Sequence, residues 1–213
     1  YNVTKVAEML AASVPRVHSD EAWYAYGKFH PLFKHRFAMG VPRDMKNRPT
    51  VFAVQSTHKM LPAFSMASYI HVSNSERGKV EWAPLKEPFM MHGTTSPFYP
   101  LIASLDIASA MMDEPSGSAL LRETVSYAVE FRKAVASVNK RFKEEGEWFF
   151  SLFQPDQVPV GKKKVDLADA ASDVLCNDPA CWTLRAGESW HGIPDEVVAG
   201  GLCLLAPTKV TIL

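Results

Sequence analysis

Two kinds of hydrophobic spacing divide the chain into elements. Apolar residues recur at helical spacing over residues 3–12 and again from Ser118 to about Glu145. Short, β-rich apolar runs occupy residues 14–18, 51–55 and 69–72, and the first of them leads directly to Asp20. Such runs are typical of strands, and their alternation with helices predicts an α/β sheet fold.

Turn signals predict what lies between these elements. The segment 21–50 combines aromatic residues with a polar, proline-containing stretch and is expected to be a loop. Residues 60–68 are expected to form a short helix or turn, and residues 73–82 a surface turn. Ser96-Pro97 predicts the start of a further helix, which ends at Pro115-Ser116-Gly117.

The last third of the chain has a less regular pattern. The stretch "EWFFSLFQP" (147–155) is predicted to be a strand, and the polar segment 160–173 a solvated connection. The end, 203–213, is apolar and β-rich. Because the first residue is Tyr and the chain enters directly into a helical pattern, we expect it to begin inside a longer sequence.

Composition narrows the class of partner. The chain has 213 residues, which suffices for one large domain, and its 23 basic and 23 acidic residues cancel. A neutral chain is not expected to bind nucleic acid, and no apolar run approaches the roughly 20 residues of a membrane helix. The cysteines, Cys176, Cys181 and Cys203, are sparse and lack zinc-ligand spacing. We therefore expect a cytoplasmic protein without a metal site.

The sequence "VQSTHKMLP" contains the candidate chemistry. Lys59 follows the apolar run 51–54, whereas lysines usually lie on solvated faces. Asp20 follows another predicted strand, and ligands of open α/β sheets bind beyond the carboxyl ends of strands. Asp20 and Lys59 are therefore expected to face one pocket although they are far apart in sequence.

These residue types suit pyridoxal 5'-phosphate. A partly desolvated lysine amine can form a Schiff base with an aldehyde, and a carboxylate at Asp20 can hold the charge on a pyridine nitrogen. Ser56 and His58 are local donors for a phosphate. Taken singly, each residue also has an ordinary interpretation: Lys59 as a solvated charge, Asp20 as a helix N-cap, and His58 as a structural histidine.

Several long motifs carry a family resemblance. The stretches "HSDEAWYAYGKFHPLF", "VQSTHKMLPAFSMASYIHV", "FMMHGTTSPFYPLIASLDIASAMM" and "SWHG" resemble the large, biodegradative-type bacterial ornithine/lysine/arginine decarboxylases. The resemblance implies the aspartate-aminotransferase fold (fold type I) of enzymes that use pyridoxal 5'-phosphate, with a mostly parallel sheet flanked by helices. It assigns residues 1–147 to part of the cofactor-binding large domain. Residues 148–213 are assigned to the end of that domain and a connection towards a C-terminal domain.

The resemblance also implies roles at the reaction centre. Lys59 is expected to carry the cofactor as a Schiff base and Asp20 to pair with its pyridine nitrogen. The substrate amine would displace Lys59, carbon dioxide would leave, and Lys59 or His58 would return a proton to the α-carbon. The implied reaction is decarboxylation of a basic amino acid, with arginine favoured over lysine and ornithine.

Further residues are expected around the cofactor. The resemblance implies that Ala22 packs on the ring face and that Trp23 lines the pocket. Ser56 and His58 are expected to bind the phosphate, and Thr94 to reach the phosphate of the neighbouring subunit in a homodimer. Trp190-His191-Gly192 matches a family signature to which no chemical step is assigned.

Some features depart from the family pattern. Ser19, Pro62, Met66 and Gly93 stand where other residues are usual, but Asp20 and Lys59 are present. The upstream phosphate loop and the flanking N-terminal and C-terminal domains of the family are not found in this chain. For these 213 residues alone we therefore expect weak or no activity. A truncated binding or assembly module, and a transaminase or aldolase on the same fold, remain alternatives.

Overall fold

The structure is a computed structural model that describes residues 1–147 and 150–213. The chain divides into two compact units, Asn2–Ser118 and Ala119–Leu213, and the second also includes Tyr1. The expected assignment of 1–147 and 148–213 to parts of one large domain stays a prediction.

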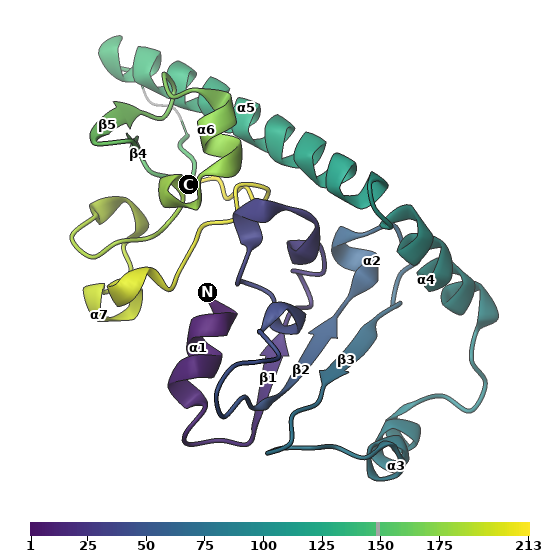
Figure 1. The fold of residues 1–213 in the computed structure, drawn as a ribbon. Helices are drawn as coiled ribbons and strands as arrows, with labels where there is room; N and C mark the ends of the chain where they lie inside the picture. Colours follow the sequence, from purple (N-terminus) through teal and green to yellow (C-terminus); the bar gives the residue numbers. More distant parts are fainter. Residues whose placement is uncertain (148–149) are drawn as a thin grey trace. The chain divides into compact units, whose positions relative to one another are not determined.

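A three-stranded sheet forms the centre of the unit Asn2–Ser118 (Figure 1). Its strands are β1 (Arg16–Asp20), β2 (Thr50–Gln55) and β3 (Tyr69–Ser73), with β2 in the middle. β1 runs parallel to β2, and β3 runs antiparallel to it. All three predicted strands are confirmed, each within a residue or two of its expected bounds.

One face of this sheet is buried under helix α1 (Val3–Leu10), which confirms the first predicted helix. The Asn2 side chain begins the helix by accepting a hydrogen bond from the Lys5 N–H at 3.0 Å. Because Cβ atoms alternate between the faces of a strand, Val51 and Ala53 point to the same side, and both are fully buried. The cluster that they form contains Val3, Ala7, Ala38, Val41, Val51 and Ala53.

The long segment between β1 and β2 is irregular, as expected. It contains three single turns of 3-10 helix, at Gly27–Phe29, Pro31–Phe33 and Ala38–Gly40. Tyr26 and Phe33 are almost completely buried, and their rings meet edge to face with centroids 5.3 Å apart. Burial of these rings holds the segment in place without regular backbone pairing.

Three helices follow β2 in this unit. A short helix or turn was expected at 60–68. The helix α2 (Thr57–Met60) ends where that range begins, and residues 61–68 are irregular. α4 (Tyr99–Met111) confirms the helix that Ser96-Pro97 predicted. α3 (Trp82–His92) was not predicted, and its interior Pro88 and lack of buried residues explain why no amphipathic pattern marks it.

The long predicted helix is confirmed as α5 (Ser116–Glu144), which extends through the boundary between the units. Its buried positions recur at helical spacing, but they include Arg132, and Leu120 of the predicted stripe is exposed. The predicted stop also holds, because Gly146 follows with a φ of 75° in the left-handed region.

The unit Ala119–Leu213 contains a hairpin where a solvated connection was predicted. β4 (Gln157–Val160) pairs antiparallel with β5 (Lys163–Asp166), so the expectation for 160–173 was wrong. Val158 and Leu167 are buried, and Gly161, with a φ of 61°, allows the tight turn. The apolar side chains, rather than the lysines between them, decide the local structure.

The predicted strand at 147–155 is wrong in its described part. Trp148 and Phe149 lie outside the described residues, and the remainder contains only an isolated bridge between Leu152 and Ile212. The β-rich end of the chain likewise forms isolated bridges, here and between Thr183 and Leu204. Two short helices, α6 (Ser172–Asn177) and α7 (Asp195–Val198), complete this unit.

The expectation of a mostly parallel sheet does not hold in the part of the chain that the structure describes. There, one strand pair is parallel and two are antiparallel. The tight turn at Gly161 is too short for a crossover, so β4 and β5 pair antiparallel, whereas β3 returns antiparallel beside β2 after a longer connection that contains α2. Within residues 1–147 and 150–213, no helix is both long and apolar enough to cross a membrane.

Candidate active site

The carboxyl ends of β1 and β2 lie at the same edge of the sheet. Asp20, the last residue of β1, pairs in parallel register with Val54. β2 ends one residue later, and Ser56 leads into α2, which carries His58 and Lys59. Parallel pairing therefore brings the two segments with candidate chemistry to the same edge of the sheet, and the prediction that Asp20 and Lys59 face one pocket stays a prediction.

The segment that follows β1 turns sharply and presents Asp20 to solvent. The Ala22 N–H donates to Asp20 Oδ1 at 3.0 Å, and no helix begins there. Asp20 therefore closes a local turn instead of capping a helix. Ala22 is half-buried, whereas Trp23 is 56% exposed.

Trp23 and Lys59 meet across this edge. The Lys59 Nζ lies 5.0 Å from the centroid of the Trp23 ring, in the geometry of a cation–π contact. Lys59 is exposed in this structure, so the partial desolvation expected for its amine is not seen here. The contact joins a residue three positions after Asp20 to the predicted Schiff-base lysine.

The side chains of Ser56 and His58, at the start of α2, differ in their hydrogen bonds. His58 Nδ1 lies 2.7 Å from the Ala67 carbonyl oxygen, which can only accept, so Nδ1 carries a proton and Nε2 is left for other partners. Ser56 stands at the N-cap position of α2, but its hydroxyl makes no capping hydrogen bond. An amine, a carboxylate and a hydroxyl are thus presented at one edge, a donor set that suits an anionic aldehyde cofactor.

Sequence reasoning missed a buried carboxylate behind this edge. Glu21 is 3% exposed and its carboxylate accepts three hydrogen bonds, from Ser19 Oγ (3.3 Å), Gln55 Nε2 (2.8 Å) and the Ala38 N–H (2.5 Å). Burial raises the pKa of Glu21, and the three hydrogen bonds oppose that rise. The available signal was an acidic residue at the start of the largely apolar stretch "EAWYAY".

Thr94 lies in the loop between α3 and α4 and is exposed. Its hydroxyl accepts a hydrogen bond from the Ser96 N–H at 3.1 Å, within the same loop. Its expected role concerns a neighbouring subunit and stays a prediction.

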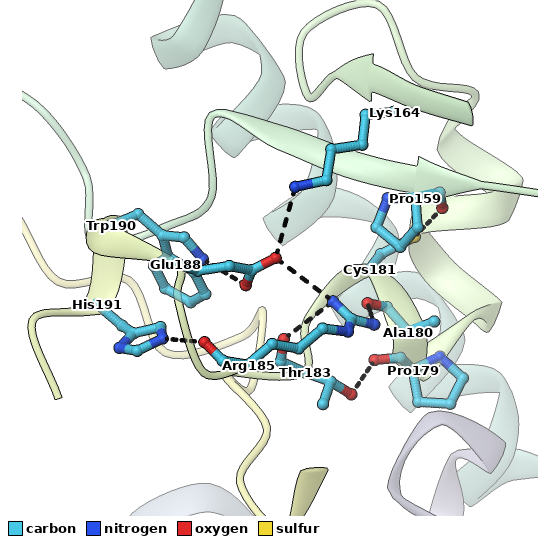
Figure 2. A network of polar contacts seen from close by, with 10 residues as sticks. All are labelled: Pro159, Lys164, Pro179, Ala180, Cys181, Thr183, Arg185, Glu188, Trp190 and His191. Atoms are coloured by element: carbon cyan, nitrogen blue, oxygen red, sulfur yellow. Dashed lines mark hydrogen bonds and ion pairs between the residues drawn. The ribbon is translucent and has the colours of Figure 1, made fainter. Parts of the chain in front are cut away.

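In the second unit, Trp190 and His191 belong to a network of polar contacts (Figure 2). Trp190 Nε1 donates to Glu188 Oε2 at 3.1 Å, and His191 Nε2 donates to the Arg185 carbonyl oxygen at 2.9 Å. His191 Nδ1 accepts from the Ile193 N–H at 3.1 Å, which fixes the tautomer. Gly192, with a φ of 61°, makes the turn between His191 and Ile193. The hydrogen bonds of Trp190 and His191 thus stabilise the loop 185–193 to which both residues belong.

Each unit also contains a cavity. A largely apolar one of about 480 Å³ in the first unit is lined by Gln55, Thr57, Tyr69 and His71 among others. A more polar one of about 760 Å³ in the second unit is lined partly by Trp190. Among the described residues, none of those predicted to bind the cofactor or to act in catalysis lines either cavity.

A parallel strand pair that carries a carboxylate and an amine at its carboxyl edge makes these strand ends the candidate ligand site of an α/β protein. Residues 1–213 match the family model described as "Orn/Lys/Arg decarboxylase, major domain", and the chain belongs to this family.

Curated relatives agree with this assignment. The chain is 43% identical to the biodegradative arginine decarboxylase of Escherichia coli (strain K12), and all of it aligns with 28% of that protein. It is also 43% identical to lysine decarboxylase LdcA of Pseudomonas aeruginosa, where all of it aligns with 26%. The chain thus spans about a quarter of the length of these relatives.

Solved structures show the same likeness. Lysine decarboxylase A from Pseudomonas aeruginosa superposes with a TM-score of 0.84 at 40% identity, over all of this chain and 26% of that one. The constitutive lysine decarboxylase of E. coli gives a TM-score of 0.72 at 34% identity, again over all of this chain and 26% of that one. The local fold is therefore that of the corresponding part of these lysine decarboxylases.

Proposed function

We propose that this chain is part of a decarboxylase that uses pyridoxal phosphate to act on a basic amino acid, with arginine favoured. The observation that carries the proposal is the placement of Asp20 and Lys59 at the same edge of the sheet, with the Lys59 amine over Trp23. The names of the relatives support the reaction class, and they include arginine, lysine and ornithine decarboxylases.

The side chains at this edge have complementary tasks. Pyridoxal phosphate, when bound, supplies an aldehyde that takes the amino acid and a ring that accepts the electrons left by carbon dioxide. Lys59 presents the amine that holds the aldehyde. Asp20 presents a carboxylate that keeps a proton on the ring nitrogen, and Ala22 leaves room for the ring. Trp23 screens one side of the amine from water.

His58 has a more restricted role than its residue type suggests. Because Nδ1–H donates to Ala67, the neutral ring offers only the lone pair of Nε2, which repels phosphate oxygens. His58 can therefore bind the phosphate only as an imidazolium, or else exchange a proton through Nε2. Ser56, whose hydroxyl caps no helix N–H, can donate to the phosphate in either case.

Borohydride reduction tests the cofactor assignment directly. The protein is incubated with pyridoxal phosphate, reduced, and mapped by peptide mass spectrometry. We expect a pyridoxyl adduct on Lys59 that Lys59→Ala abolishes and Lys34→Ala, a change at another exposed lysine, leaves intact. A folded protein without the adduct would contradict the proposal and favour the binding or assembly module.

The substrate needs a separate assay. Release of carbon dioxide and amine from arginine, lysine and ornithine should be compared in the longest natural polypeptide that contains this sequence. We expect arginine to give the highest kcat/KM. Formation of a keto acid without carbon dioxide would contradict the decarboxylase assignment.

We further propose that the protein acts as a cytoplasmic homodimer in which Thr94 reaches the partner's phosphate site. Large apolar side chains of α3 and α4 support a subunit interface there, since Trp82, Met91 and Tyr99 are each more than 60% exposed. Tyr99→Glu is expected to shift the protein to a monomer in light scattering, whereas Tyr127→Glu, on α5, is not. A monomer in the unchanged protein would contradict this proposal.

A further inference from the structure

The carboxylate of Glu21 lies buried directly behind the edge that carries Asp20 and Lys59. One oxygen, Oε1, accepts from Ser19 Oγ and from the Ala38 N–H. The other, Oε2, accepts from the amide of Gln55. All three partners are donors, and an ionised carboxylate is the side-chain group that can accept from all of them at once.

These contacts join the two strand ends. Ser19 immediately precedes Asp20 in β1, and Gln55 immediately precedes Ser56 at the end of β2. The Glu21 backbone N–H also donates to the Val54 carbonyl oxygen at 2.9 Å and so extends the parallel pairing by one residue. Side chain and backbone of one residue thus connect both segments that bear the proposed chemistry.

We propose that Glu21 is a positioning residue that sets the placement of Asp20 relative to Lys59. The effect of Glu21 on catalysis rests on the proposed function, whereas its hydrogen bonds between the ends of β1 and β2 do not depend on that function. Glu21 touches neither Asp20's carboxylate nor the amine, and it acts through Ser19 and Gln55. Substitutions that remove an acceptor should therefore loosen the two strand ends together, without opening the rest of the sheet.

The surroundings explain why a charged group is tolerated there. Three donors compensate the carboxylate for its lost hydration. Tyr24, on the segment that follows β1, interacts electrostatically with Glu21, and Arg36 in turn interacts with Tyr24. Hydrogen bonds to a buried carboxylate are stronger than those of exposed surface pairs, so their loss should be measurable at single residues.

Amide hydrogen exchange tests the connection without any cofactor. We expect Glu21→Ala to raise exchange rates by about tenfold in residues 20–24 and 55–60, but not at 72–73, which pair with β2 at the other end of the sheet. Glu21→Gln keeps the shape and should give a smaller rise in the same segments. Arg48→Ala is the matched control, because Arg48 is 5% exposed and bonds Ser73 and Asn74 at the opposite end of the sheet. Equal rises at both ends in all variants would overturn the proposal.

Cofactor loading of the same proteins connects this role to the chemistry. We expect Glu21→Ala to lower the yield of the Lys59 adduct about tenfold and to shift the pH midpoint of the cofactor absorbance, and Arg48→Ala to do neither. If the unchanged protein forms no adduct but Glu21→Ala loosens both strand ends, the proposed function fails and the positioning role stands. If the adduct forms equally in Glu21→Ala and in the control, the positioning role fails and the function stands.

Discussion

The amine of Lys59 lies over the indole ring of Trp23, with Nζ 5.0 Å from the ring centroid. Such a contact at an exposed site contributes ~0.5–1 kcal/mol. Removing the ring should therefore leave the amine more open to reagents. We expect Trp23→Ala to raise the rate of Lys59 acetylation about two- to fivefold in peptide mass mapping.

Two further variants serve as controls for this measurement. Trp23→Phe keeps an aromatic face and should change the rate less than Trp23→Ala does. Trp82→Ala removes another exposed indole, on α3, and should leave Lys59 unchanged. An unaltered rate in Trp23→Ala would show that the contact does not shield the amine in solution.

Glu21 should give the protein an unusual pH dependence. Because burial raises its pKa above the unfolded value of about 4.5, the folded state holds the Glu21 proton more tightly than the unfolded state does. Its contribution to stability is complete below pH 4.5 and declines as the pH rises through the raised pKa. Relative to Glu21→Gln, the unchanged protein should lose stability over that interval in urea unfolding. A pH-independent difference between the two would contradict the assignment.

His71 should produce the opposite slope. Burial lowers its pKa below about 6.5, so the unfolded state takes up a proton first as the pH falls. Stability is therefore lost as the pH decreases from 6.5 towards the lowered pKa. His71→Asn should remove this loss in urea unfolding, whereas His35→Asn, at an exposed position, should retain it.

Arg132 stabilises the second unit from inside helix α5. Its fully buried guanidinium donates to the carbonyl oxygens of Pro207 (2.8 Å), Lys209 (2.7 Å) and Phe153 (3.2 Å), and to the Gln154 side chain (3.1 Å). Arg132→Met leaves these acceptors unpaired and should lower the free energy of unfolding by about 3 kcal/mol. Arg122→Met, at an exposed position of the same helix, should cost less than about 0.5 kcal/mol in the same urea titration.

Gly192 provides a test of the loop around His191. Its φ of 61° lies in the left-handed region, where a Cβ costs about 1–2 kcal/mol. Gly192→Ala should therefore increase the rate of limited proteolysis within residues 185–193, and Gly192→Asn should do so less, because Asn tolerates this conformation. Equal cleavage of both variants and the unchanged protein would show that the loop does not depend on this turn.

Local signals in the sequence were sufficient for much of the first unit. The apolar runs at 14–18, 51–55 and 69–72 became strands because alternation and turn residues act over a few neighbouring positions. Their order also placed Asp20 and Lys59 after strands, and the parallel pairing of β1 with β2 then brought both to one edge.

Only the tertiary structure decided which charged residues are buried and where the β4–β5 hairpin forms, because both depend on residues distant in sequence. Glu21 and Arg132 are charged residues that a local pattern assigns to solvent, yet each is buried because donors or acceptors from distant segments surround it. The β4–β5 hairpin likewise forms where lysines predicted a solvated connection, because Val158 and Leu167, on either side of those lysines, are buried. Residue spacing by itself determined most of the strands and helices of the first unit. Whether Glu21 and Arg132 could be buried was decided only by the hydrogen-bonding groups that the tertiary structure placed around them.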